Sequence, residues 1–200
     1  MPEHEKPVVV PYDPAWAADG VALCAQLRSA LGPLALHVDH IGSTSVPGMA
    51  AKDIFDVQVS VAELDTAAAA FEAPLAALGF VRSPYLGDHV PAGREDSGDS
   101  GDSGDPADWA KRFWSRRTAD APPVNLHVRR AGSPNERLAL LFRDWLRATP
   151  AAVPAYARFK YVLADAVPDT GTYADVKDPV VDLVAVVAEQ WAASTGWRPH

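Results

Sequence analysis

The sequence has little that would place the protein in a membrane or in an oxidising compartment. Its 200 residues include one cysteine, Cys24, which cannot form an internal disulfide. No apolar run approaches the roughly 18 to 20 residues that span a bilayer. The first residues also lack the basic segment and apolar stretch of a secretory signal. We therefore expect a cytoplasmic protein that does not associate with membranes.

The sequence also lacks an excess of basic residues, and lysine in particular is scarce. The net charge is −8, from 18 lysines and arginines against 26 aspartates and glutamates. Six of the carboxylates lie between Glu95 and Asp108, and removing them from the total leaves −2 for the remaining residues. A broadly basic nucleic-acid-binding surface is excluded, although a local basic cleft is compatible with this balance. We do not expect a nucleic-acid partner.

A low-complexity segment interrupts the chain. The stretch EDSGDSGDSGDPAD repeats Ser-Gly-Asp three times and has no apolar residue to anchor it, which predicts disorder over residues 94–108. Its acidic spacing is not that of an EF-hand calcium loop. Around this insert we expect an α/β core over residues 1–131. A helical C-terminal part over residues 132–200 packs on that core, so that the two form one structural unit.

Apolar periodicity predicts an α/β (α+β) fold, a mixed sheet with flanking helices. Two segments alternate clearly: residues 53–61 place Asp56 and Gln58 on a polar face, and residues 124–130 do the same for Asn125, His127 and Arg129. Further strands are predicted at 34–41, within 80–90 and at 109–117. Helices are predicted at 15–31, 62–78, 134–148, 150–167 and 173–195, the last broken near Pro179.

A candidate phosphate site lies where the strand at 34–41 runs into a Gly-Ser turn. Glycine permits close approach of the backbone to an anion, and unpaired N–H groups at a helix start point at it. The turn supplies hydroxyl groups as well. These considerations predict phosphate binding by Gly42, Ser43, Thr44 and Ser45.

Asp56 follows the Gly-Ser turn on the next strand, as in enzymes of the nucleotidyltransferase fold. Such enzymes place two carboxylates at i and i+2, which hold two Mg²⁺ ions that orient a triphosphate. Here the i+2 residue is Gln58, which has a carbonyl oxygen but no charge, and His127 stands where a third carboxylate is expected. Asp56 and His127 would therefore hold one divalent ion or act as an acid–base pair.

Several segments resemble the GrpB family of predicted nucleotidyltransferases over nearly the whole chain. The most specific is HIGSTSVPG, residues 40–48, followed by Ala51-Lys52 and Asp56. Other matching segments are Val10-Pro11-Tyr12-Asp13-Pro14-x-Trp16, Asn125-Leu126-His127-Val128, Phe142-Arg143-Asp144-x-Leu146-Arg147, Tyr156-Ala157-x-x-Lys160 and Tyr173-x-x-x-Lys177. The resemblance implies a nucleotidyltransferase-like α/β domain with a helical C-terminal part. It also implies kinship with a domain fused to dephospho-CoA kinase in some bacteria. It identifies no substrate.

The candidate residues divide into three roles. We predict catalytic roles for Asp56 and His127, and metal binding by Asp56 and Gln58 with Mg²⁺ or Mn²⁺. In addition to the turn, the predicted phosphate-binding residues are Lys52, Arg129, Arg143, Arg147 and Lys160. Each of these residues could instead have a purely structural role. Arg143 and Arg147, for example, share a helix face that could simply be exposed to solvent.

Two functions therefore remain open at this point. One is an enzyme that binds a nucleotide or other phosphorylated small molecule and transfers a nucleotidyl or phosphoryl group with a divalent metal. The other is a catalytically degenerate module that binds a nucleotide or other phosphorylated compound. Gln58 discriminates between them, because a two-metal enzyme needs a further carboxylate near Asp56 from elsewhere in the fold.

Overall fold

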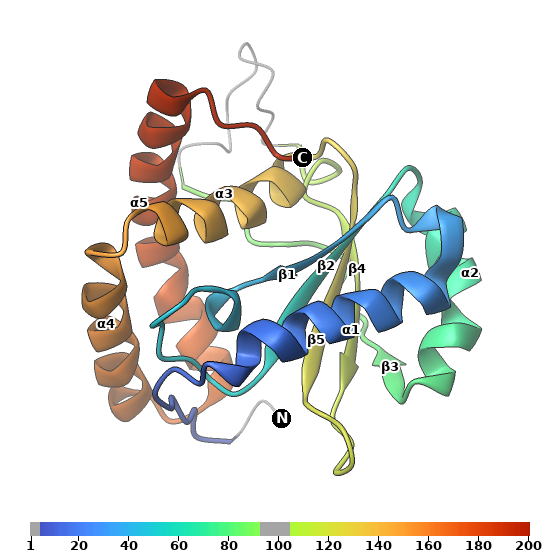
Figure 1. Cartoon of the computed structure of the whole chain (residues 1–200), viewed down its shortest axis with the longest axis horizontal. Helices are drawn as coiled ribbons and strands as arrows, with labels where there is room; N and C mark the ends of the chain where they lie inside the picture. Colours follow the sequence, from blue (N-terminus) through green and yellow to red (C-terminus); the bar gives the residue numbers. More distant parts are fainter. Residues whose placement is uncertain (1–4, 93–104) are drawn as a thin grey trace.

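A computed structural model, describing residues 5–92 and 105–200, contains one five-stranded mixed sheet (Figure 1). The strands are β1 (His37–Ile41), β2 (Phe55–Val61), β3 (Phe80–Arg82), β4 (Lys111–Arg116) and β5 (Val124–Arg130), in the order β1-β2-β5-β4-β3. The pair β2 and β5 is parallel, and the other neighbouring pairs are antiparallel. The predicted α/β class with a mixed sheet is confirmed.

The apolar face of the sheet builds the main core. It carries Val57 and Val59 of β2 and Leu126 of β5, all fully buried. Helices α1 (Ala15–Leu31) and α2 (Leu64–Ala77) cover this face and contribute buried residues such as Leu27 and Phe71. The period-2 alternation predicted for both strands is confirmed, because every second residue enters this core.

The C-terminal helices lie together on the opposite side, at the left of Figure 1. They are α3 (Pro134–Ala148), α4 (Ala152–Ala166) and α5 (Thr170–Thr195). Their second core includes Leu141 and Tyr156 and also buries Val46 and Met49 from the segment after β1. The helical part thus packs on the loop that carries the Gly-Ser turn. The predicted boundary between residues 131 and 132 falls between β5 and α3 and stays a prediction.

Several element bounds differ from expectation. The strand predicted at 34–41 begins only at His37, because Gly32-Pro33-Leu34 form a short 3₁₀ helix. Between residues 80 and 90 only β3 forms, with an isolated bridge from Gly87 to Ala110. The expected break at Pro179 is wrong: α5 is helical throughout its length. A proline removes one helical hydrogen bond, and the neighbouring Val180 packs on the second core.

The predicted acidic insert is only partly described. Residues 93–104 lie outside the described part of the chain, whereas residues 105–108 enter a turn. Asp108 in that turn accepts a hydrogen bond from Arg130 at 2.8 Å. The predicted disorder is therefore wrong for residues 105–108, and the rest of that prediction falls on residues outside the described part of the chain. Among the described residues, none of the helices is long and apolar enough to cross a membrane.

Candidate functional site

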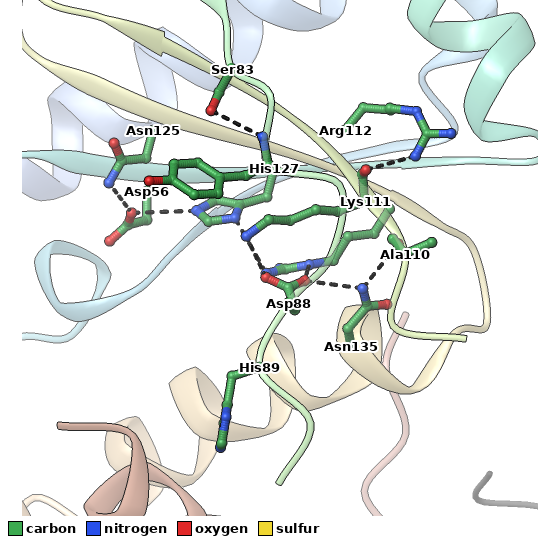
Figure 2. Close-up of polar contacts among 12 residues, drawn as sticks. Asp56, Ser83, Asp88, His89, Ala110, Lys111, Arg112, Asn125, His127 and Asn135 are labelled. Atoms are coloured by element: carbon green, nitrogen blue, oxygen red, sulfur yellow. Dashed lines mark hydrogen bonds and ion pairs between the residues drawn. The ribbon is translucent and has the colours of Figure 1, made fainter. Parts of the chain in front are cut away.

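Strand register places the predicted polar residues side by side. Asp56 pairs with Asn125 and Gln58 pairs with His127 across the parallel β2–β5 ladder. These side chains and Arg129 occupy the face of the sheet that turns away from the main core, and Figure 2 shows Asp56, Asn125 and His127 in contact there. Because the pairing is parallel and in register, the polar alternation of two separate segments becomes one continuous row.

Asp56 is held as a carboxylate whose side chain is only partly buried. Its Oδ1 accepts a hydrogen bond from Asn125 Nδ2 at 2.8 Å and lies 3.6 Å from His127 Nε2. Burial alone would raise the pKa of Asp56, but the contact with His127 and its charge when protonated, the hydrogen bond from Asn125 and the charge of Lys177 lower it below its usual range. The side chain remains 31% exposed. It can therefore meet a ligand in its charged form.

The tautomer of His127 follows from its neighbours. His127 Nδ1 lies 3.3 Å from Arg129 Nη2, and a guanidinium can only donate. Nδ1 must accept, which places the ring proton on Nε2, facing Asp56. Burial, followed by the charge of Arg129, lowers the pKa of His127 to about 4. In this arrangement the neutral ring orients Asp56, and its acid–base role stays a prediction.

Gln58 has both ends of its amide engaged inside the protein. The side chain is fully buried, its Oε1 accepts from Arg129 Nη1 at 2.5 Å, and its Nε2 donates to the backbone oxygen of Glu136 at 3.3 Å. A metal at Gln58 would have to displace the guanidinium. No group of three or more His, Cys, Asp or Glu residues in the described chain could hold a metal ion. These donors do not fit a two-ion cage.

A second carboxylate, Asp88, enters the site from the loop after β3. It accepts from Arg129 Nε and Lys111 Nζ, each at 2.7 Å, and from Asn135 Nδ2 at 3.0 Å (Figure 2). Burial would raise its pKa, but Arg129 and Lys111 lower the pKa far below its usual range. The sequence reasoning missed Asp88, because it lies in a segment read as strand and its cations come from other strands.

Most of the side-chain hydroxyl groups in the Gly-Ser turn form hydrogen bonds within the protein. The turn forms a short 3₁₀ helix, η2 (Ser43–Ser45). The Thr44 hydroxyl lies 2.8 Å from His40 Nε2, and Ser45 Oγ donates to the Gly42 oxygen at 2.6 Å. Both residues are buried. Of the three predicted hydroxyl residues, Ser43 alone lines the two cavities described below.

Two predicted phosphate ligands on α3 contact protein groups instead, Arg147 in this turn and Arg143 in β1. Arg147 donates through two nitrogens to the backbone oxygen of Ser45, at 2.9 and 3.0 Å. Arg143 donates to Asp144 at 2.7 Å and to Asp39 and the His40 oxygen at 3.3 Å. Neither arginine lines the two cavities described below, so their positions lend no support to the phosphate-binding role predicted for them.

Two adjoining cavities open beside Ser43. The first, which we call the lysine chamber, has a volume of about 370 Å³, and the second has about 250 Å³. Both are bordered by Ser43, Asp56 and His127. The chain has five lysines, and four of them line the lysine chamber: Lys52, Lys111, Lys160 and Lys177. The scarcity of lysine in the sequence does not by itself indicate this site, because the clustering of the lysines becomes visible only in the tertiary structure.

Lys160 is the most confined of these lysines. It is 2% exposed, and its Nζ donates to Ser43 Oγ at 2.9 Å and to the backbone oxygen of Ala50. Burial, together with the charges of Lys177 and Lys52, lowers its pKa to about 7. Burial and Lys177 also lower the pKa of Lys52. Cations that disfavour one another's charge across a cavity are stabilised when an anion enters it.

The fold and the site together define an α/β protein with a lysine-lined cavity between the polar face of its sheet and its C-terminal helices. Residues 6–186 match the family profile described as GrpB protein, and the chain belongs to this GrpB family. It is also similar to the crystal structure of conserved protein GrpB from Enterococcus faecalis. That similarity has a TM-score of 0.68 and 26% identity, and covers 92% of this chain and 99% of that one.

Similar sequences include proteins of two different lengths. A dephospho-CoA kinase from Mycolicibacterium paratuberculosis is 39% identical over 198 residues, covering 96% of this chain and 48% of that protein. A UPF0157 protein from Halalkalibacterium halodurans is 32% identical, covering 92% of this chain and 83% of that protein. The chain thus spans about half the length of the dephospho-CoA kinases it matches.

Proposed function

We propose that the lysine chamber binds a phosphorylated small molecule or nucleotide in the cytoplasm. The observation that carries this proposal is the convergence of four of the five lysines on one cavity next to Ser43. Of these four, Lys111 is paired with Asp88. Lys52, Lys160 and Lys177 come from three different segments, and none of them forms such an ion pair with a carboxylate in residues 5–92 or 105–200. An anion with several oxygens matches such a cluster, because each ammonium is a compact donor of hydrogen bonds.

The direct test is a thermal-shift and calorimetric screen with pyrophosphate, ATP and dephospho-CoA. Dephospho-CoA is included because similar proteins are named dephospho-CoA kinase. Lys177→Met should weaken binding about tenfold or more, since it removes a cation that borders both cavities. Lys6→Met is the matched control, because Lys6 is exposed and pairs with Asp165. If no phosphorylated compound binds, or both variants behave alike, the proposal is wrong.

A second candidate is metal-dependent transfer of a nucleotidyl or phosphoryl group. Asp56 favours it, since its charged carboxylate faces the same cavity and both of its contacts described above involve Oδ1. Mg²⁺ commonly binds one or two carboxylates together with the phosphate oxygens of a substrate. Asp56 and the ligand would supply such a set for one Mg²⁺ or Mn²⁺, without Gln58. The chain itself would orient the phosphates through its lysines.

Asp56→Asn separates the two candidates. The variant keeps the shape of the side chain but removes the negative charge beside the lysines, so binding measured without metal should hold or tighten. Any strengthening of binding by Mg²⁺ or Mn²⁺ should disappear in the variant. Transfer of labelled phosphoryl or nucleotidyl groups should disappear with it. If Mg²⁺ and Mn²⁺ change neither binding nor transfer in the wild type, the chain is a binding module.

A further inference from the structure

We propose that the second cavity receives the apolar part of the ligand, so that the ligand is a phosphate ester of a planar or apolar group, such as a nucleoside diphosphate. This inference rests on the proposed binding of phosphate in the lysine chamber. It assigns a different class of chemistry to the adjoining 250 Å³ cavity, which we call the apolar chamber. The two chambers would hold two parts of one molecule.

The apolar chamber has a wall contributed by all three C-terminal helices. Leu138, Ala139 and Phe142 come from α3, Tyr156 from α4 and Val181 from α5. The Phe142 and Tyr156 rings meet edge to face with centroids 5.6 Å apart. Except for the buried Tyr156, these side chains are only half-buried. Apolar and aromatic walls with a few fixed polar groups are typical of sites for organic ligands.

The two chambers meet at the polar row of the sheet. Ser43, Asp56 and His127 border both of them, and so does Lys177. A molecule with its anionic end among Lys52 and Lys160 therefore has Asp56 at its middle and the α3–α5 wall at its other end. That placement puts the charged carboxylate near the phosphate that adjoins the organic group.

The charges around the chambers also set the direction in which such a ligand binds. Asp182 borders the apolar chamber, accepting from His89 Nε2 at 3.0 Å and from the Ala92 N–H at 3.1 Å. Asp178 lies one helical turn away, 3.9 Å from His89 Nδ1, and borders both chambers. Lys52 and Lys160 line only the lysine chamber. A phosphate is therefore repelled near Asp182 and Asp178 and attracted near Lys52 and Lys160.

The test compares pyrophosphate with ADP, GDP, CDP and UDP, which carry the same diphosphate with and without an organic group. In the wild type at least one nucleoside diphosphate should bind tenfold or more tightly than pyrophosphate, measured by calorimetry. If pyrophosphate binds and none of the four binds more tightly, the inference is wrong while the proposed phosphate site stands. If neither pyrophosphate nor any nucleotide binds, the proposed function itself is wrong.

Two variants locate the organic group. Ala139→Leu fills the apolar chamber and should weaken the preferred nucleoside diphosphate about tenfold while changing pyrophosphate affinity less than twofold. Ala148→Leu, at an exposed position of the same helix, is the matched control and should change neither. Leu138→Ala serves if Ala139→Leu does not fold, and should weaken the nucleotide alone. Equal weakening of both ligands, or of neither, would overturn the assignment.

Discussion

Two aspartates on the same side of the sheet have opposite surroundings. Asp88 is 14% exposed and is paired directly with two cations, Arg129 and Lys111. Asp56 is 31% exposed, and its direct partners are the amide of Asn125 and the neutral ring of His127. Both carboxylates are ionised, but in different ways. The directly paired cations Arg129 and Lys111 lower the pKa of Asp88, whereas contacts with His127 and Asn125 and the charge of Lys177 lower that of Asp56.

The difference teaches which carboxylate can take part in ligand chemistry. A carboxylate between two close cations has its charge satisfied within the protein, and removing it leaves those cations buried without a partner. A carboxylate oriented by neutral groups keeps its charge available to the cavity. Asp88 borders the same two cavities as Asp56, but its carboxylate is paired with Arg129 and Lys111. The predictions below test this division.

The largest expected effect is on folding, from Asp88→Asn. This variant leaves Arg129 and Lys111 without their anion and should lower the free energy of unfolding by about 3 to 5 kcal/mol. Asp56→Asn should cost less, about 1.5 to 3 kcal/mol, because it weakens hydrogen bonds to a charged group but leaves no buried cation without its direct partner. Urea unfolding followed by circular dichroism measures both, with the exposed Asp65→Asn as control. Equal losses at positions 56 and 88 would contradict the division.

Lys160 provides the next test, on the Asp56 side of the site. Its pKa is about 7 in the folded state and near 10.4 when unfolded, so between these values the unfolded chain binds more protons. Stability should therefore rise with pH from about 7 to 10, by up to about 1.4 kcal/mol per pH unit, relative to Lys160→Met. Unfolding curves at several pH values measure this slope. If Lys160→Met and Lys6→Met show the same dependence of stability on pH, Lys160 stays charged in the folded protein.

Gly42 and Gly32 form a matched pair that tests the close contact between Gly42 and Asp56. Both have almost the same backbone conformation, φ +68° and ψ −168° for Gly42 and φ +66° and ψ −156° for Gly32. A Cβ at position 42 would lie 2.4 Å from Asp56 Oδ2, whereas one at position 32 meets nothing within 4 Å. Gly32→Ala should cost about 1 to 3 kcal/mol from backbone strain.

Gly42→Ala should cost at least about 1 kcal/mol more than Gly32→Ala, because Asp56 must also move. Ligand affinity should fall in the Gly42 variant alone. Chemical unfolding and the phosphate-binding assay measure the two effects separately. If the two alanine variants lose the same stability and bind ligand equally, the close approach of Gly42 to Asp56 has no consequence.

The smallest effect concerns the protonation of His127, which lies between the two aspartates. Nitrogen-resolved NMR should find its proton on Nε2 and a titration midpoint near pH 4, below the ordinary value of about 6.5. The unfolded chain binds this proton first, so the His127 contribution to stability is lost as the pH falls from about 6.5 to 4. If the ring is charged at pH 6, the prediction is wrong, and His127 is a cation like Arg129 and Lys111, which surround Asp88.

Local patterns sufficed for some of these features. Alternation in β2 and β5 predicted which side chains leave the core, and the Gly-Ser turn was found from its composition. The same patterns could not assign Thr44, Ser45, Arg143 or Arg147. Their chemistry suits phosphate, but their partners are protein oxygens or His40, brought near by packing of α3 and α1. Asp88 was missed because no short-range pattern connects it with Arg129, 41 residues away.

The sequence by itself determined the family, the α/β class and the polar faces of the two central strands, because these depend on motifs and on periodicities of a few residues. Only the tertiary structure decided how the charges are distributed. In the folded protein, four of the five lysines line one cavity. Gln58 accepts a hydrogen bond from Arg129. Asp88 is paired with cations, whereas the direct partners of Asp56 are neutral groups. Ion pairing and desolvation depend on distances between segments remote in the chain, and those distances exist only once the helices have packed on the sheet.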